Sequence, residues 1–366
     1  MIVRDEEAYL DDCLRSIVDE VDEIVIVDTG SRDRTCDIAR RYGARLFSFP
    51  WTGDFAAARN HALDQASGDW ILYIDADERL VVPTAGALRA AVAQPDVVAL
   101  AVRFQPRANF TPYREIRIFR RDPRIRFRGV IHETMRPDLH TVLQTDGMAL
   151  AVADVGITHV GYDGEMIGKY RRNLPLLEAA VKKTPDRVFL WTDMAEALAG
   201  LGRNEEAARA CRRAIELAEA SQELKQRHDA VPAWRRLIAL SAAEPAEAVA
   251  LARRALALYP LSHSLQYDLA RALFAAGRTD ELFPIVDALT AIDPETFSHP
   301  IVAYDKRIFG EWAFDLKGAA HARRGHRAEA AAAFARAAAL APDNLAYRAK
   351  ATAFAAANAS PARPPG

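Results

Sequence analysis

The 366-residue sequence has few cysteines, no long apolar run and almost no net charge. Its three cysteines are an odd number without metal-ligand spacing, which predicts reduced thiols instead of a disulfide framework or a zinc site. The formal net charge of −2 lacks the basic excess that binding to nucleic acid requires. No run reaches the ~18 apolar residues of a membrane-spanning helix, and the first residues lack a signal-peptide pattern. The sequence predicts a cytoplasmic protein, compatible with a peripheral position at the inner membrane face, with no nucleic-acid partner and no integral membrane segment.

The first half of the chain has the pattern of an α/β fold. Up to about Gly161, short apolar runs alternate with amphipathic stretches, which predicts βαβ units around a mixed, largely parallel sheet. The β-branched run at 23–28 is typical of a strand covered on both faces. Helices are predicted over 33–42 and from an N-cap at Asp54. Further strands are predicted at Ala44–Phe49, Trp70–Ile74, Val97–Phe104, Glu115–Arg120 and Ala149–Val155.

The second half has the pattern of a helical repeat. From about Glu165 the predicted strands end, and Pro260 and Pro294 stand about 34 residues apart, the tetratricopeptide period. In three units a glycine is followed five residues later by the position where the second helix must approach the first: Gly202 and Ala207, Gly277 and Leu282, Gly325 and Ala330. These units resemble tetratricopeptide repeats. The unit from Pro232 to Pro260 lacks the glycine, and an insertion at 293–309 interrupts the period.

Acidic residues gather where predicted strands end. Asp28 ends one strand, and Asp75 and Asp77 end another, at the edge where open α/β folds bind ligands. Carboxylates spaced by one residue can hold Mg²⁺ or Mn²⁺ against a diphosphate. Such a metal would neutralise the charge on a departing nucleoside diphosphate. An Asp-x-Asp alone also fits solvated turn carboxylates, so the surrounding sequence must decide.

Three ordered strings provide that context: DTGSRDRT at 28–35, FAAARNHAL at 55–63 and GDWILYIDADE at 68–78. Together they resemble the donor-binding half of family-2 glycosyltransferases with the A-type fold, over most of residues 1–162. Members of that family usually carry several more first-strand residues before the equivalent of residues 1–7. Either the native start lies upstream of Met1, or the base pocket is built from a shorter strand.

The resemblance implies roles for individual residues. Asp28 would accept a hydrogen bond from the nucleotide base, and Arg59 would face the base or a phosphate. Asp75 would lie at the ribose and metal, and Asp77 would bind the metal. Simpler roles are a turn cap for Asp28 and a surface ion pair for Arg59. Further contacts with the nucleotide sugar are implied for Val3, Asp5, Glu7, Asn60 and Ala76.

Two later strings complete the resemblance, FRGVIHE at 127–133 and THVGY at 158–162. They imply a carboxylate base near the acceptor and a late histidine on the metal, which we assign to Glu133 and His159. A base must reach within ~3 Å of the acceptor's proton, and an imidazole ligand would favour Mn²⁺ over Mg²⁺. The alternatives for the base are His132 and Asp154.

The sequence thus predicts an A-type glycosyltransferase domain with a Rossmann-like mixed sheet at 1–162, an all-α tetratricopeptide-like domain at 163–358 and a disordered tail at 359–366. The predicted reaction moves a sugar, with inversion and with Mn²⁺ or Mg²⁺, from a nucleoside-diphosphate sugar to a glycan, lipid-linked or protein acceptor. The repeats would hold the acceptor and could support self-association. Two rivals are a non-catalytic scaffold, disfavoured by the clustered carboxylates, and a sugar nucleotidyltransferase, disfavoured because residues 4–7 are acidic.

Overall fold

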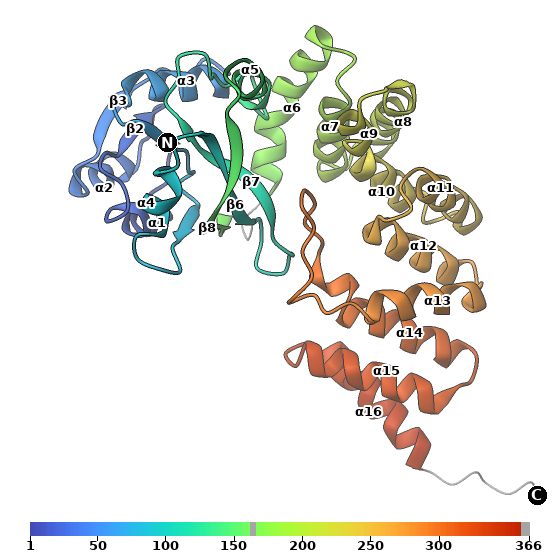
Figure 1. Ribbon diagram of the computed structural model, residues 1–366. Coiled ribbons are helices and arrows are strands. Elements are labelled where there is room, and N and C mark those ends of the chain that lie inside the picture. Colours follow the sequence, from blue (N-terminus) through green and yellow to red (C-terminus); the bar gives the residue numbers. More distant parts are fainter. Residues whose placement is uncertain (162–165, 360–366) are drawn as a thin grey trace, which may run out of the picture. The chain divides into compact units, whose positions relative to one another are not determined.

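A computed structural model describes residues 1–161 and 166–359 of the chain (Figure 1). Apart from Ala359, the predicted disordered tail lies outside these residues. None of the described helices is long and apolar enough to cross a membrane. The predicted cytoplasmic location stays a prediction.

Packing divides the chain into two compact units. The first comprises Met1–Ala180 together with His299–Ala303, and the second comprises Val181–Ser298 and the chain from Tyr304 onward. Most of the long helix α6 (Met166–Lys183) therefore belongs to the first unit. The domain boundary predicted after residue 162 stays a prediction.

The first unit contains two β-sheets, and helices connect their strands. The predicted α/β class with a mixed sheet is confirmed. A parallel sheet has the order β1-β2-β3, and a mixed sheet has the order β4-β7-β6-β8-β5. In the mixed sheet β6 and β8 are parallel and the other neighbours antiparallel. The strands are β1 (Ile2–Val3), β2 (Val25–Asp28), β3 (Arg45–Ser48), β4 (Trp70–Leu72), β5 (Glu78–Val81), β6 (Val97–Gln105), β7 (Tyr113–Arg120) and β8 (Ala149–His159).

Helices connect these strands. Asp54 caps α3 as predicted, because its carboxylate accepts a hydrogen bond from the Ala57 amide at 2.9 Å. Three elements were not predicted, namely β5, α4 and α5, and each is short or carries few apolar residues. The helices of this unit are α1 (Leu10–Ile17), α2 (Thr35–Arg41), α3 (Phe55–Gln65), α4 (Ala87–Val92), α5 (Arg136–Asp146) and α6.

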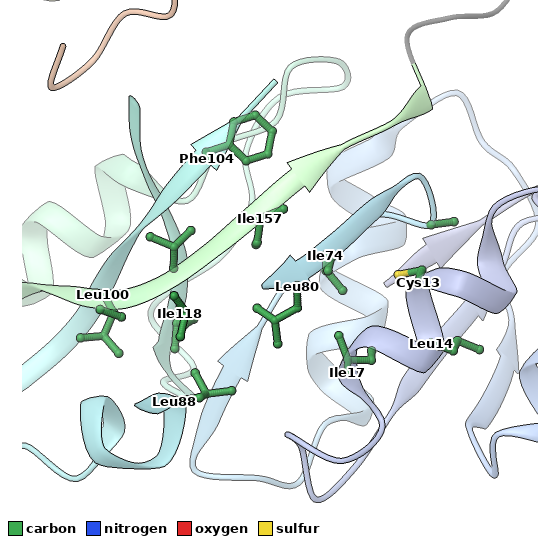
Figure 2. Packing of buried hydrophobic residues seen from close by; sticks show 14 of the residues in the cluster. Cys13, Leu14, Ile17, Ile74, Leu80, Leu88, Leu100, Phe104, Ile118 and Ile157 are labelled. Atoms are coloured by element: carbon green, nitrogen blue, oxygen red, sulfur yellow. The ribbon is translucent and has the colours of Figure 1, made fainter. Parts of the chain in front are cut away.

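A hydrophobic core lies between α1 and the mixed sheet (Figure 2). Leu14 and Ile17 of α1 pack with Leu80 of β5 and Leu100 of β6, and each of these side chains is buried. Ile74 precedes β5 and belongs to the same core. Burial of such side chains stabilises a fold by ~1.5–3 kcal/mol each. The core therefore anchors the segment between β4 and β5, where the two predicted metal-site aspartates lie.

Among its described residues the second unit contains helices and no β-strand, as predicted. Its helices after α6 are α7 (Val188–Gly200), α8 (Asn204–Ala220), α9 (Leu224–His228), α10 (Val231–Leu240), α11 (Pro245–Leu258), α12 (His263–Ala275), α13 (Thr279–Thr290), η2 (Lys306–Ile308), α14 (Glu311–Arg323), α15 (Arg327–Leu340) and α16 (Leu345–Ala359). The short η2 lies in the insertion that interrupts the repeat period.

The three repeat glycines end helices in the same way. Gly202, Gly277 and Gly325 have φ values of 77°, 74° and 77°, in the left-handed region that favours glycine. The three residues that follow them by five positions are fully buried, because each stands where one helix of a pair meets the other: Ala207, Leu282 and Ala330. The sequence pattern thus identified both the helix ends and a buried position in the second helix of each pair.

Candidate active site

The turn from Asp75 to Asp77 joins β4 to β5 and is held from several sides. The Asp75 carbonyl accepts a hydrogen bond from the Glu78 amide at 3.0 Å and one from the Cys13 thiol at 3.3 Å. The Glu78 carboxylate accepts one from the Asp75 amide at 2.9 Å. Ala76 is buried between the two aspartates. The turn therefore has a fixed backbone, and both aspartate side chains stay partly exposed.

Arg59 of α3 joins Asp75 to Glu133. Its Nη2 donates to both carboxylate oxygens of Asp75, at 2.9 and 3.2 Å, and its Nε donates to Glu133 Oε1. The guanidinium carbon also lies 5.6 Å from the ring centres of both Tyr73 and Phe127, within the range of cation–π attraction. Because the Arg59 side chain is only 12% exposed, this is a buried ion-pair network and not the surface pair considered from the sequence.

Arg117 of β7 and Glu78 form a second, deeper ion pair. Their two nitrogen–oxygen distances are 2.9 and 2.7 Å, and both residues are buried. Burial raises the pKa of Glu78. Burial would also raise the pKa of Asp75, but the guanidinium groups of Arg59 and Arg117 outweigh this effect and lower it. Asp75 is therefore ionised at neutral pH.

Arg117→Met should lower the free energy of unfolding by ~3–5 kcal/mol, because it leaves the Glu78 carboxylate buried without its partner. Urea unfolding at pH 7 measures the effect. Arg89→Met is the matched control, since the Arg89–Asp22 pair is exposed and its loss should change the free energy of unfolding much less. Equal effects of the two substitutions would contradict the role of Arg117 beneath the turn.

Glu133 is positioned by a tight hairpin between β7 and α5. Arg128 and Thr134 exchange two backbone hydrogen bonds of 3.0 Å across it. Gly129 and His132 both have positive φ, 104° and 52°. The side chain of His132 makes this backbone conformation cost free energy, whereas Gly129 adopts it readily. The hairpin thereby directs the Glu133 carboxylate onto Arg59.

The same hairpin is fastened to α3. The Asn60 side chain donates to the Phe127 carbonyl and accepts from the Phe127 amide, each at 2.9 Å. The Phe55 amide donates to the Val130 carbonyl at 2.9 Å. In this structure Asn60 therefore positions the segment before Glu133, and its predicted contact with the nucleotide sugar stays a prediction.

The three candidates for the base differ in position. Glu133 is linked to Asp75 through Arg59, and His132 is its neighbour on the strained hairpin. Asp154 is exposed on β8 between the buried Ala153 and Val155, so it lies on the outward side of that strand. The geometry favours Glu133, and its catalytic role stays a prediction.

Asp77 contacts His159, the last residue of β8. His159 Nε2 lies 3.1 Å from Asp77 Oδ2, and the antiparallel pairing of β5 with β8 brings the two segments together. Two ligand atoms at right angles on an octahedral ion, each ~2.1 Å from it, are ~3 Å apart. The spacing and the oxygen and nitrogen donors therefore fit one divalent ion. Among the described residues no group of three or more His, Cys, Asp or Glu side chains lies where it could hold a metal ion.

Four residues predicted to contact the nucleotide sugar lie in two segments that bind each other, at the ends of β1 and β2 and in the loops that follow. Asp28 accepts hydrogen bonds from the amides of Gly30 and Ser31, at 3.2 and 3.0 Å, which is the turn cap considered from the sequence. Asp5 accepts one from the Arg32 amide at 2.7 Å, and Glu7 accepts one from the Arg34 amide at 3.1 Å. Val3 is buried and pairs with Asp28 between β1 and β2. The loops are thus preformed, and nucleotide contacts by these residues stay predictions.

Part of the chain matches a known protein family. Residues 1–149 match the model of the family described as "Glycosyl transferase family 2". The resemblance to that family is confirmed. His159 follows this family-2 region (residues 1–149) along the chain.

Three relatives cover parts of the chain. A TPR repeat-containing protein of Synechococcus elongatus is 40% identical over 197 residues, which are 52% of this chain and 49% of that protein. The SPbeta prophage-derived glycosyltransferase SunS of Bacillus subtilis is 26% identical over 207 residues, 51% of this chain and 45% of that protein. The lipopolysaccharide core biosynthesis glycosyltransferase LpsC of Rhizobium meliloti is 42% identical over 85 residues, 22% of this chain and 31% of that protein. This chain thus spans less than half the length of each.

Among solved structures, YrrB, a TPR protein with an unusual peptide-binding site, aligns with 50% of this chain and 84% of its own length. The sequence identity is 16% and the TM-score is 0.38.

Two residues near the family-2 carboxylates were not singled out from the sequence. Burial, followed by the charges of Asp77 and Asp75, raises the pKa of Glu6 to about 7. Arg172 of α6 is electrostatically coupled to Glu6, and its guanidinium carbon lies 5.8 Å from the ring centre of Phe55. The acidic string at 4–7 could have indicated Glu6, but only the packing of α6 brings Arg172 to this region.

Glu6→Gln should stabilise the protein above pH 7 and have little effect at pH 4. The folded pKa is raised, so the wild type is protonated in both states below pH 4.5 and loses stability as pH rises from there to about 7. Glutamine mimics the protonated form and removes that loss. Thermal unfolding from pH 4 to 8 tests this expectation, and parallel curves for the two proteins would refute it.

A cavity of the first unit lies away from these carboxylates. It has a volume of about 370 Å³, and apolar residues before β2, in α3 and in β4 line it, including Ile24, Leu63, Trp70 and Leu72. Arg59 borders it, but neither Asp75 nor Asp77 does. The ionisable groups predicted for the site therefore converge at the charged turn and not in this cavity.

Proposed function

We propose that the chain transfers a glycosyl group, with inversion, from a nucleoside-diphosphate sugar to an acceptor. The observation that carries the proposal is the arrangement at the β4–β5 turn. Asp77 pairs with His159 at 3.1 Å, and Asp75 is joined through Arg59 to Glu133. Asp75, Asp77, Arg59 and Glu133 lie within the residues that match the family, and His159 follows them. The strands on either side of the turn, β4 and β5, each pair antiparallel with a neighbour, so the turn does not lie at the carboxyl edge of the parallel sheet as the sequence predicted.

In the proposed reaction Asp77 and His159 hold Mn²⁺ or Mg²⁺. The ion would supply charge neutralisation for the departing diphosphate. Asp75 faces the ribose, and Asp28 accepts a hydrogen bond from the base. The bond between the anomeric carbon and the acceptor oxygen forms as the bond to the diphosphate oxygen breaks, and Glu133 takes the acceptor's proton.

The ion pair with Arg59 gives the Glu133 carboxylate two states, one paired with the guanidinium and one released from it. Its guanidinium contacts both Glu133 and Asp75 in the structure. A diphosphate is a bidentate anion that competes for such a guanidinium. We infer that donor binding draws Arg59 toward a phosphate and thereby releases the Glu133 carboxylate for the acceptor.

The acceptor is a glycan, a lipid-linked intermediate or a protein. The helical pairs of the second unit would hold it, because stacked pairs present an extended binding surface. Self-association through the same repeats would compete with that role. The relatives named above include a lipopolysaccharide core glycosyltransferase and a TPR repeat-containing protein, which supports an acceptor outside nucleic acids.

Thermal unfolding with nucleoside diphosphates, each with and without Mn²⁺, tests the proposal. A ligand that binds the native state at a hundred times its Kd stabilises it by ~2.7 kcal/mol. We expect one diphosphate to stabilise the protein in Mn²⁺ and much less after addition of a chelator. Absence of stabilisation by every nucleotide would refute it.

A second candidate is a non-catalytic scaffold whose repeats bind a protein. It is favoured by one observation, the naming of the Synechococcus elongatus relative as a TPR repeat-containing protein. A scaffold with a degenerate transferase region would bind no diphosphate, so the same unfolding experiment separates the two functions.

A further inference from the structure

The segment after β8 contacts Asp77 at three successive residues. His159 Nε2 lies 3.1 Å from its carboxylate, and the Val160 amide donates to its carbonyl at 2.8 Å. Gly161 follows and lies against the aspartate side chain itself. A Cβ built on Gly161 would overlap Asp77 Oδ2 and stand 2.7 Å from its Cβ and 2.8 Å from its Cγ. Atoms of real side chains do not approach so closely.

Gly161 is required here for space and not for backbone freedom. It is absent from the glycines with positive φ, in contrast to Gly129 of the hairpin. The nearest contacts of a Cβ on Gly129 or Gly156 would be 3.3 Å, which a small shift relieves. At Gly161 the obstacle is Asp77, the residue before β5. The backbone of Asp77 is held in place, because its carbonyl accepts a hydrogen bond from the Val160 amide and the next residue, Glu78, pairs with His159 between β5 and β8.

We propose that Gly161 is a positioning residue for the metal site. By lacking a side chain it lets the Asp77 carboxylate keep the orientation in which Oδ2 faces His159 Nε2, so that one ion can contact both. This inference rests on the proposed function, because it assigns Asp77 and His159 to the metal. Gly161 lies beyond the residues that match the family model, so that match does not extend to it.

The test compares Gly161→Ala with Gly168→Ala in the full chain. Gly168 lies in α6, and a Cβ there would meet no described atom within 4 Å. Isothermal titration with Mn²⁺ alone, then with inorganic pyrophosphate in Mn²⁺, gives readouts independent of turnover. We expect Gly161→Ala to weaken Mn²⁺ binding ~10–100-fold, the range for groups that orient a metal ligand. Gly168→Ala should bind as the wild type does.

Two outcomes overturn the inference. The first is wild-type Mn²⁺ affinity in Gly161→Ala. The second is a loss of Mn²⁺ affinity in Gly168→Ala as large as that in Gly161→Ala, because the loss would then not depend on the contact with Asp77. Absence of Mn²⁺ binding in the wild type would instead overturn the proposed metal function, and this inference with it.

A stability cycle covers the case in which Gly161→Ala folds poorly. If the overlap is with Asp77, Asp77→Gly removes every overlapping side-chain atom and should restore the stability of Gly161→Ala in the double variant. Urea unfolding of the four proteins gives this coupling directly. Additive losses would show that the alanine clashes elsewhere, which contradicts the inference whatever the metal does.

Discussion

Asp77→Asn is expected to lower glycosyl transfer about a hundredfold or more, and to abolish Mn²⁺-dependent binding of a diphosphate, while the fold persists. The amide keeps the size of the side chain but loses the charge that binds a divalent ion beside His159. Asp77 is partly exposed, so the uncharged amide of Asp77→Asn should have little effect on the stability of the fold. Turnover at saturating Mn²⁺ and titration calorimetry with the diphosphate measure the two losses.

Asp96→Asn is the matched control for this substitution. Asp96 is exposed before β6, and its side chain has no part in the turn between β4 and β5. Its variant should keep wild-type turnover. Near-normal turnover in Asp77→Asn, or full activity of the wild type in a chelator, would sink the metal hypothesis. His159→Ala should weaken the same Mn²⁺-dependent nucleotide binding.

Glu133→Gln is expected to lose transfer by ~10²–10⁴-fold and to keep nucleotide and Mn²⁺ binding. Glutamine cannot take the acceptor's proton, but its carbonyl oxygen still accepts a hydrogen bond from Arg59. Single-turnover transfer and nucleotide titration on the same preparation separate the chemical step from binding.

The same substitution also weakens a buried ion pair, so stability must be measured beside turnover. Glu115→Gln is a suitable control, because Glu115 pairs with Arg136 at 3.1 Å outside the turn. The two variants should unfold at nearly the same urea concentration, and only Glu133→Gln should lose transfer. Transfer at the wild-type rate would pass the role of base to Asp154 or His132. A loss of transfer explained wholly by unfolding would make Glu133 a structural residue.

Local sequence patterns were sufficient for most of the secondary structure. The β-branched run predicted β2, and Asp54 predicted the start of α3. The repeat glycines marked the ends of α7, α12 and α14. Each of these signals acts within a few residues, through side-chain branching, capping or positive φ. By contrast, β5 is stabilised mainly by its partner β8 and by the core beneath it, so its own sequence gave no clear period.

The sequence by itself determined the fold class, the helical repeats and the aspartates at the strand ends, because these follow from periodicity and from the spacing of motifs. Only the tertiary structure decided how the ionisable groups pair. Arg59 and Glu133 are far apart along the chain, and so are Arg117 and Glu78, yet each pair is in contact. The closeness of Gly161 to Asp77 likewise depends on the pairing of β5 with β8. No local pattern encodes such contacts, because they arise only when strands distant in sequence align side by side.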